Sequence, residues 1–214
     1  HQRQVRRGPQ VLQQDLAGGG AVRRQQLGQD PARACGRAEV VDGRPVFGII
    51  YAPAQNSMYS ASTGGGAKLN GWAIAVSPRK KLEDARLIAN SSSLKQQHWQ
   101  EPLPRIERLS VPSLALRLAY VAQGLADAAF ALTYKHDWDL AAGDLLVSEA
   151  HGIMSDLDGS LLRYDFKRSA RLGFIGAGDQ VSGDALGQRD PGARVDAHAD
   201  DADQQNRVDH IHNR

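Results

Sequence analysis

All twelve aromatic residues of this 214-residue chain lie between Phe47 and Phe174. The two ends are instead rich in Gln, Arg, Asp, Gly and Ala, and such segments bury too little apolar surface to offset the entropy lost on ordering. The aromatic residues therefore predict one folded unit over about residues 38–176. We expect segment 1–37 to be poorly ordered or mistranslated, and segment 177–214 to form an acidic, disordered tail.

The net charge of +2 is the sum of two oppositely charged ends. Residues 1–37 carry seven Arg and two Asp, a net charge of +5, whereas residues 177–214 carry four Arg and eight Asp, a net charge of −4. An overall charge near zero favours neither nucleic acid nor an acidic partner. The basic end also lacks the aromatic side chains that stack on bases, so we expect no specific nucleic-acid binding.

The sequence gives several indications of the cellular compartment in which the protein works. The single cysteine, Cys35, excludes an internal disulfide and is typical of a reducing compartment, which predicts a cytoplasmic protein. No apolar run has the length of a membrane span, and no signal-peptide pattern opens the chain, so we expect no membrane partner. The chain starts at His1 rather than Met, and we expect it to be a fragment. The sequence leaves the oligomeric state open, with a homodimer as one option.

Turn residues divide the first half of the predicted unit into short strands. Asp42-Gly43 and Asn70-Gly71 are typical hairpin turns, and they predict an antiparallel meander between residues 40 and 76. The run Gly64-Gly65-Gly66 could cradle a phosphate, but neither a Lys-Ser/Thr pair nor a helix start follows it. A hairpin turn is therefore favoured there.

Helices and strands alternate in the second half. Ser113 is predicted to cap a helix that ends at Gly124. Residues 126–132 are apolar on both faces, which predicts a central strand. A second helix is predicted over residues 140–150, followed by a hairpin around Asp158-Gly159. This alternation predicts the mixed α/β class.

The second helix begins with the chain's strongest candidate site. Asp139 is predicted to be the N-cap, where a carboxylate accepts from the first turn and still points an oxygen outward. A hard divalent cation and a phosphate could meet at such a carboxylate. The alternative is that Asp139 only caps the helix and that Trp138 only fills the core. Helical spacing also predicts that Asp144 faces solvent.

Five motifs occur in one order along the chain, followed by the hairpin around Asp158-Gly159: VFGIIYAPA (46–54), MYSAS (58–62), GGGAKLNG (64–71), PSLALRLAYVAQGLADAAF (112–130) and WDLAAGDLLVSEAHG (138–152). Together they resemble the inositol monophosphatase family of Mg-dependent phosphomonoesterases. That family includes the inositol monophosphatases and the 3′(2′),5′-bisphosphate nucleotidases. The resemblance covers about residues 38–176 and implies the C-terminal part of a layered α/β sandwich.

The resemblance implies roles for individual residues. It makes Asp139 a ligand of a Mg²⁺ ion that stabilises the phosphate ester of a small substrate, an inositol monophosphate or a 3′-phosphorylated nucleotide. It places Ser113 on the substrate side, with Pro112 where the family has Gly. Apart from the resemblance, His136 lies close to Asp139 in the sequence and is a candidate to contact substrate or act as an acid, with a plain surface role favoured. Asp137 either supports the metal site from outside or interacts with the helix dipole.

The chain departs from the family pattern upstream. The family's first motif, Asp-Pro-x-Asp-Gly-Thr, and a Glu before it supply further metal ligands, and neither is present. The N-terminal segment offers only Asp15-Leu16-Ala17-Gly18 and Asp30-Pro31. Mg²⁺ requires several oxygen ligands, which a single Asp cannot supply. The alternative function is therefore a catalytically inactive fragment or remnant of the family, and no catalytic residue is assigned.

Overall fold

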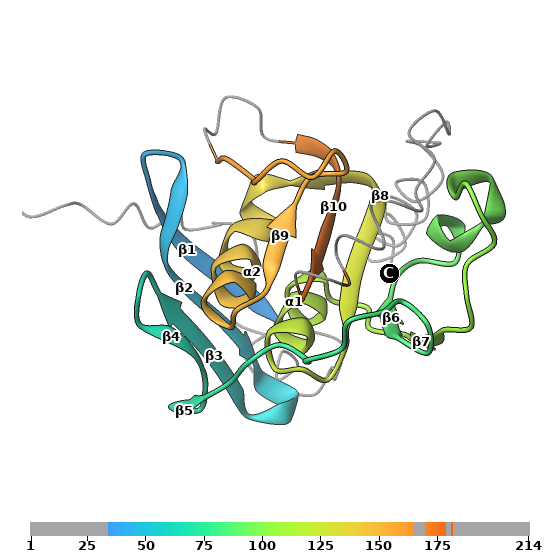
Figure 1. Cartoon of the computed structure of the whole chain (residues 1–214). Helices are drawn as coiled ribbons and strands as arrows, with labels where there is room; N and C mark the ends of the chain where they lie inside the picture. The colour runs from blue at the N-terminus through green and yellow to red at the C-terminus, as the bar shows by residue number, and fades with distance from the viewer. Residues whose placement is uncertain (1–33, 165–169, 179–180, 182–214) are drawn as a thin grey trace, which may run out of the picture.

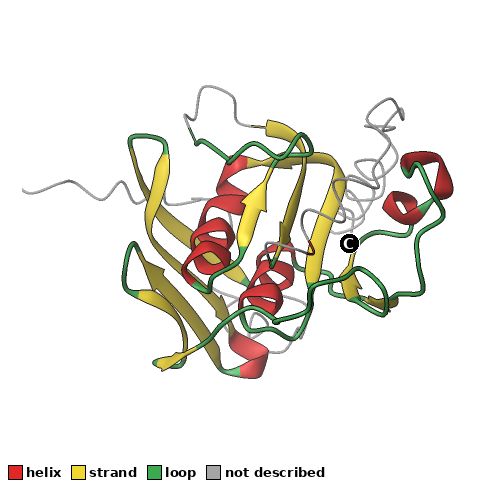
Figure 2. Cartoon of the chain, viewed as in Figure 1, coloured by secondary structure: helices red, strands yellow, loops and turns green. Residues whose placement is uncertain are grey.

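The computed structural model describes residues 34–164, 170–178 and 181. Within this part of the chain, two five-stranded sheets lie on either side of a layer of two α-helices (Figure 1). Figure 2 shows the two helices between the strands of the two sheets. The predicted layered α/β class is confirmed. The predicted end segments, 1–37 and 177–214, lie almost entirely outside the described residues.

The first sheet is an antiparallel meander in which each strand pairs with the next along the chain. Its strands are β1 (Cys35–Val41), β2 (Arg44–Ala52), β3 (Ser57–Ser62), β4 (Gly66–Leu69) and β5 (Trp72–Ala73). Asp42 and Gly43 both have positive φ, as do Asn70 and Gly71, which is the backbone geometry of tight hairpin turns. The predicted meander and its two turns are confirmed.

The second sheet has the order β7-β6-β8-β10-β9. Its strands are β6 (Arg86–Ile88), β7 (Glu107–Leu109), β8 (Ala128–His136), β9 (Ile153–Ser155) and β10 (Ala170–Ala177). Strand β6 runs parallel to β7 and β8, whereas β10 runs antiparallel to β8 and β9. The prediction of a central apolar strand is confirmed by β8. The sequence did not predict β7 or β10.

Short 3-10 turns connect several of these elements: η1 (Pro53–Gln55), η2 (Ser92–Leu94) and η3 (Gln96–His98). The turns η2 and η3 belong to a loop that covers the outer face of the second sheet. There the ring of Trp99 packs edge-to-face on that of Phe130, with the ring centroids 5.5 Å apart. None of the helices in the described part is both long and apolar enough to cross a membrane.

Helix α1 (Leu114–Ala122) begins where the sequence predicts. Ser113 is its N-cap: the backbone there is extended, and Oγ accepts from the Leu116 N–H at 3.4 Å. The helix ends before Gly124, whose φ of 72° reverses the chain.

Helix α2 (Asp137–Glu149) begins earlier than predicted, and the prediction of Asp139 as its N-cap is wrong. Strand β8 extends to His136, whose extended backbone makes it the N-cap, so strand and helix join without a loop. Asp139 is the third residue of the helix. After the helix, His151 has a φ of 68°, a conformation that Gly adopts at lower cost.

Small residues allow α2 to lie close to its neighbours. A Cβ at Gly48 would be 3.3 Å from the Cα of Ala142, and a Cβ at Gly143 would be 2.2 Å from Leu118 Cδ1 of α1. A glycine inside a helix costs about 1 kcal/mol relative to Ala. Here that cost is offset by the close contact between the two helices and between α2 and the first sheet.

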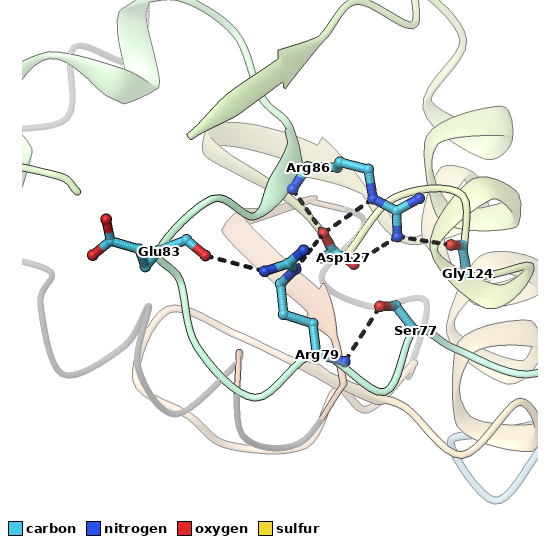
Figure 3. A network of polar contacts seen from close by, with 6 residues as sticks. All are labelled: Ser77, Arg79, Glu83, Arg86, Gly124 and Asp127. Carbon is cyan, nitrogen blue, oxygen red and sulfur yellow. Dashed lines mark hydrogen bonds and ion pairs between the residues drawn. The ribbon is translucent and has the colours of Figure 1, made fainter. Parts of the chain in front are cut away.

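A buried carboxylate fixes the start of β8 (Figure 3). Asp127 Oδ2 accepts from the backbone N–H of Arg86 at 2.7 Å, and Oδ1 pairs with Arg86 Nη2 at 2.7 Å. The guanidinium of Arg79 adds a second charged donor, with Nε 3.1 Å from Oδ2 of Asp127. Burial alone would raise the pKa of Asp127, but the Arg86 hydrogen bonds outweigh it and lower the pKa to about 2. The charged network thereby links the loop that contains Arg79 to the starts of β6 and β8.

Candidate functional site

The candidate site is the junction where β8 runs directly into α2. Trp138, the second helical residue, is 58% exposed, so the alternative that it only fills the core is wrong. Its ring stacks on that of His136, with centroids 4.2 Å apart and planes within 8° of parallel. Both rings are presented to solvent beside Asp139.

Asp139 lies on the exposed surface of the first turn of α2. Partial burial raises the pKa of its carboxyl group, while the nearby charges of His136 and Lys135 act in the opposite direction. Lys135 is half-buried and its Nζ donates to Thr133 Oγ1 at 2.8 Å. The junction therefore combines an outward carboxylate, basic side chains and the positive end of a helix dipole.

The metal-binding capacity of this junction is small. Across residues 34–164, 170–178 and 181, no three His, Cys, Asp or Glu side chains are grouped so that they could hold a metal ion. Asp139 could supply one oxygen ligand, but Mg²⁺ requires several arranged around it. The described donors alone thus do not fit a Mg²⁺ site. Asp15 and Asp30, the acidic residues of the N-terminal segment, lie outside the described residues.

Asp137 is buried, with 1% of its surface exposed, and forms an ion pair that the sequence did not predict. Its Oδ1 accepts from Arg171 of β10 through both Nη2, at 2.6 Å, and Nε, at 2.9 Å. Its other oxygen, Oδ2, is buried and has no hydrogen-bond partner among the described residues. Arg171 lies 34 residues further along the chain, so no local pattern could have indicated the pair.

A second buried acid lies two turns further along α2, where the prediction that Asp144 faces solvent is wrong. Asp144 Oδ2 accepts from the Tyr164 hydroxyl at 2.9 Å, and Oδ1 accepts from Ser148 Oγ at 3.2 Å. Burial raises the pKa of Asp144 to about 6, although the hydrogen bond from Tyr164 lowers it. Helical spacing correctly places Asp144 and Ser148 on one face, but the chain around Tyr164 covers Asp144.

The two remaining sequence candidates lie outside this junction. Ser113 is half-buried at the start of α1, where its hydroxyl caps the helix. The glycine run forms the turn between β3 and β4, as predicted, and two of its amides bind a carboxylate of this chain: Gly64 and Gly66 both donate to Glu149 at 2.9 Å. The junction at β8 and α2 thus brings together His136 and Asp139, whereas Ser113 lies on a different helix.

Comparison with known proteins identifies close similarity over most of the folded part. The model of the inositol monophosphatase family matches residues 38–188. A Nus factor SuhB of Xylella fastidiosa is 38% identical over 131 residues, which is 58% of this chain and 47% of that protein. An inositol-1-monophosphatase of Mesorhizobium japonicum is 38% identical over 125 residues, 55% of this chain and 47% of that protein. The chain thus spans about half the length of these relatives.

Solved structures agree with the fold. The extragenic suppressor protein SuhB of Bartonella henselae superposes with a TM-score of 0.60 at 30% identity, covering 73% of this chain and 63% of that one. The inositol monophosphatase of Anabaena gives a TM-score of 0.62 at 24% identity, covering 74% and 66%. At that identity, the second likeness shows the fold alone.

Proposed function

The chain belongs to the inositol monophosphatase family, and from that membership we propose that it acts in the hydrolysis of a phosphate monoester on a small molecule. The observation that carries the proposal is the position of Asp139 in the first turn of α2. There an exposed carboxylate lies in the turn whose backbone N–H groups have no acceptor within the helix. This is a suitable place for a cation and a phosphate to meet.

The proposal assigns separate tasks to the residues of the junction. Asp139 supplies one oxygen ligand to a divalent cation, Mg²⁺, while the first-turn N–H groups favour the negative charge of a phosphate. His136 and Ser113 contact the substrate, which is an inositol monophosphate or a 3′-phosphorylated nucleotide. Within the described residues no group of three His, Cys, Asp or Glu side chains accompanies Asp139, so Asp139 alone would not complete a Mg²⁺ site.

A second candidate function follows from that same shortage of ligands. The chain can be a non-catalytic member of the family, which keeps the fold and lacks the metal site. The observation that favours it is the absence, across the described residues, of any group of three acidic or metal-binding side chains. The missing Asp-Pro-x-Asp-Gly-Thr motif agrees with this candidate.

Phosphate release from the full 214-residue chain separates the two candidates. Inositol 1-phosphate and adenosine 3′-phosphate would be assayed with Mg²⁺ from zero to ten millimolar and with a chelator. The enzyme candidate predicts release that saturates with Mg²⁺ and falls by more than about 100-fold in Asp139→Asn, since even residues behind a metal ligand contribute roughly 10- to 100-fold. Glu101→Gln removes an exposed carboxylate elsewhere and should leave the rate unchanged. No release with either substrate would favour the non-catalytic candidate.

A further inference from the structure

Strand β1 is the longest edge strand in the described part of the protein. The first sheet ends at β1 and β5, and the second ends at β7 and β9. Strands β5, β7 and β9 have two or three residues each, whereas β1 has seven. Among the described residues β1 pairs only with β2, so the backbone groups along its outer edge meet no described strand. An open edge of this length is a template for another strand.

The strand lacks the features that usually keep an edge from pairing. Its sequence, CGRAEVV, contains neither Pro nor Lys. Its register with β2 shifts between Glu39 and Val40, which pair with Phe47 and Pro45. The extra residue is therefore Val46 of β2, and β1 itself continues without a bulge.

The side chains of β1 divide between the two faces of the first sheet. A Cβ on Gly36 would lie 3.5 Å from the Cβ of Ala142, so Gly36 faces α2. Successive residues of a strand point to opposite faces, so Cys35, Arg37 and Glu39 point away from the helix. Arg37 and Glu39 are exposed, and neither forms an ion pair with another described residue.

These two charges restrict how two copies of β1 can pair. Directly opposed residues of antiparallel strands point to the same face, so a two-fold axis normal to the sheet has to pass through a residue. An axis at Arg37 or at Glu39 would place two like charges opposite each other. An axis at Ala38, the middle residue, places Arg37 of each copy opposite Glu39 of the other and pairs all seven residues.

We propose that two copies of this chain associate through β1, antiparallel and with Ala38 at the two-fold axis. The two five-stranded first sheets then form one continuous sheet. The backbone groups of the open edge supply the hydrogen bonds, and the two Arg37–Glu39 pairs set the register. Each copy uses the same surface, so the assembly closes as a dimer. The pairing involves neither Asp139 nor a metal ion and is independent of the proposed function.

Sedimentation equilibrium of the full chain, from low to several hundred micromolar, measures the association. We expect a mass of twice 23.1 kDa at the higher concentrations. Arg37→Glu opposes two carboxylates at each pair, and should raise the dissociation constant about tenfold or more. Arg37→Glu/Glu39→Arg restores opposite charges and should restore the dimer. Lys68→Glu is the matched control, because it makes the same charge change at an exposed position of β4 in the same sheet, and it should have no effect.

A disulfide cross-link tests the register. The axis at Ala38 places Cys35, the chain's only cysteine, opposite Val41 of the second copy. Opposed Cα atoms lie about 4.5–5.5 Å apart, within the span of a disulfide, whereas positions 35 and 41 of one strand are about 20 Å apart. Val41→Cys should therefore form a disulfide between position 35 of one chain and position 41 of the other on mild oxidation. Met58→Cys, at an exposed position of β3, should form none with Cys35.

The outcomes distinguish this dimer from other uses of the same surface. A mass of one chain at every concentration would overturn the proposal and leave the edge of β1 to solvent or to another part of the chain. A dimer that Lys68→Glu weakens as much as Arg37→Glu would place the contact on the face of the sheet and overturn it as well. So would a dimer that the charge exchange fails to restore and that Val41→Cys fails to cross-link, in variants that thermal unfolding shows to be folded.

Discussion

Two buried aspartates on one continuous segment of the chain have opposite electrostatic character. Asp127 precedes β8 and is enclosed by two arginines, and its pKa falls to about 2. Asp144 lies in α2, is held by two hydroxyl groups, and has a pKa raised to about 6. Both carboxylates are almost inaccessible to solvent. Burial raises the pKa of both carboxyl groups: the hydrogen bonds from Arg86 outweigh it at Asp127, whereas those from Tyr164 and Ser148 do not outweigh it at Asp144.

Asp127 and Asp144 lie in the two elements that form the candidate site, at the start of β8 and within α2. Asp127 anchors the beginning of β8 with charged donors, which fixes the strand that leads into the candidate site. Asp144 belongs to the helix whose first turn carries Asp139. Asp127 therefore stays charged far below neutral pH, whereas the carboxyl group of Asp144 titrates much nearer to neutral pH, with a pKa of about 6.

The largest effect is expected for Asp127→Asn. The substitution leaves two arginines without their counter-charge, and breaking such a pair costs about 3–5 kcal/mol of unfolding free energy. Urea denaturation at pH 7 measures it. Asp84→Asn is the matched control, because Asp84 pairs with Arg105 at the surface, and it should leave the unfolding free energy nearly unchanged. If Asp127→Asn and Asp84→Asn lowered the unfolding free energy equally, the buried ion pairs of Asp127 would contribute no more than the surface pair of Asp84.

The corresponding substitution at Asp144, Asp144→Asn, should instead raise the unfolding free energy at neutral pH. Its pKa rises from 3.8 to about 6 on folding, so its contribution to stability is complete below about pH 4 and is lost as the pH rises to about 6. Two pKa units correspond to about 3 kcal/mol. Asp144→Asn should therefore gain about 3 kcal/mol relative to the unsubstituted chain between pH 4 and pH 7. Urea denaturation of both chains across that pH range measures this difference. Unfolding free energies that change with pH in the same way in the two chains would contradict the prediction.

A smaller effect is expected for Tyr164→Phe. The ring still packs under Arg171, but Asp144 loses the hydroxyl that stabilises its charge, which costs about 1–3 kcal/mol. Tyr134→Phe is the control, because Tyr134 is half exposed. Thermal unfolding at pH 7 measures the difference between the two variants. A Tyr164 variant as stable as the Tyr134 variant would show that the hydroxyl does not support Asp144.

Much of the fold could be predicted because its signals are local. The Asp42-Gly43 and Asn70-Gly71 turns specify their hairpins within a few residues, and Ser113 marks the start of α1 through its own hydrogen bond. Strand β10 was missed because its pairing with β8 joins residues far apart in sequence. The N-cap of α2 was misplaced because an N-cap aspartate and an aspartate in the first turn give similar sequence patterns.

The candidate site could be predicted only in part. Asp139 and His136 were identified from the Trp-Asp pattern and the family resemblance, and the structure places them at one junction. The Asp137–Arg171 ion pair and the burial of Asp144 under Tyr164 join residues that are 34 and 20 positions apart in the sequence. Their roles follow from tertiary contacts, which periodicity does not contain.

The most direct test of the account is to observe the side-chain carboxyl carbons of the aspartates by NMR while Mg²⁺ is added to the full chain. The account predicts that the Asp139 resonance shifts with Mg²⁺, whereas those of Asp127 and Asp144 stay in place because they are buried within the protein's own hydrogen bonds. An Asp139 resonance that does not respond to Mg²⁺ at ten millimolar would contradict its proposed role as a metal ligand and favour a non-catalytic member of the family.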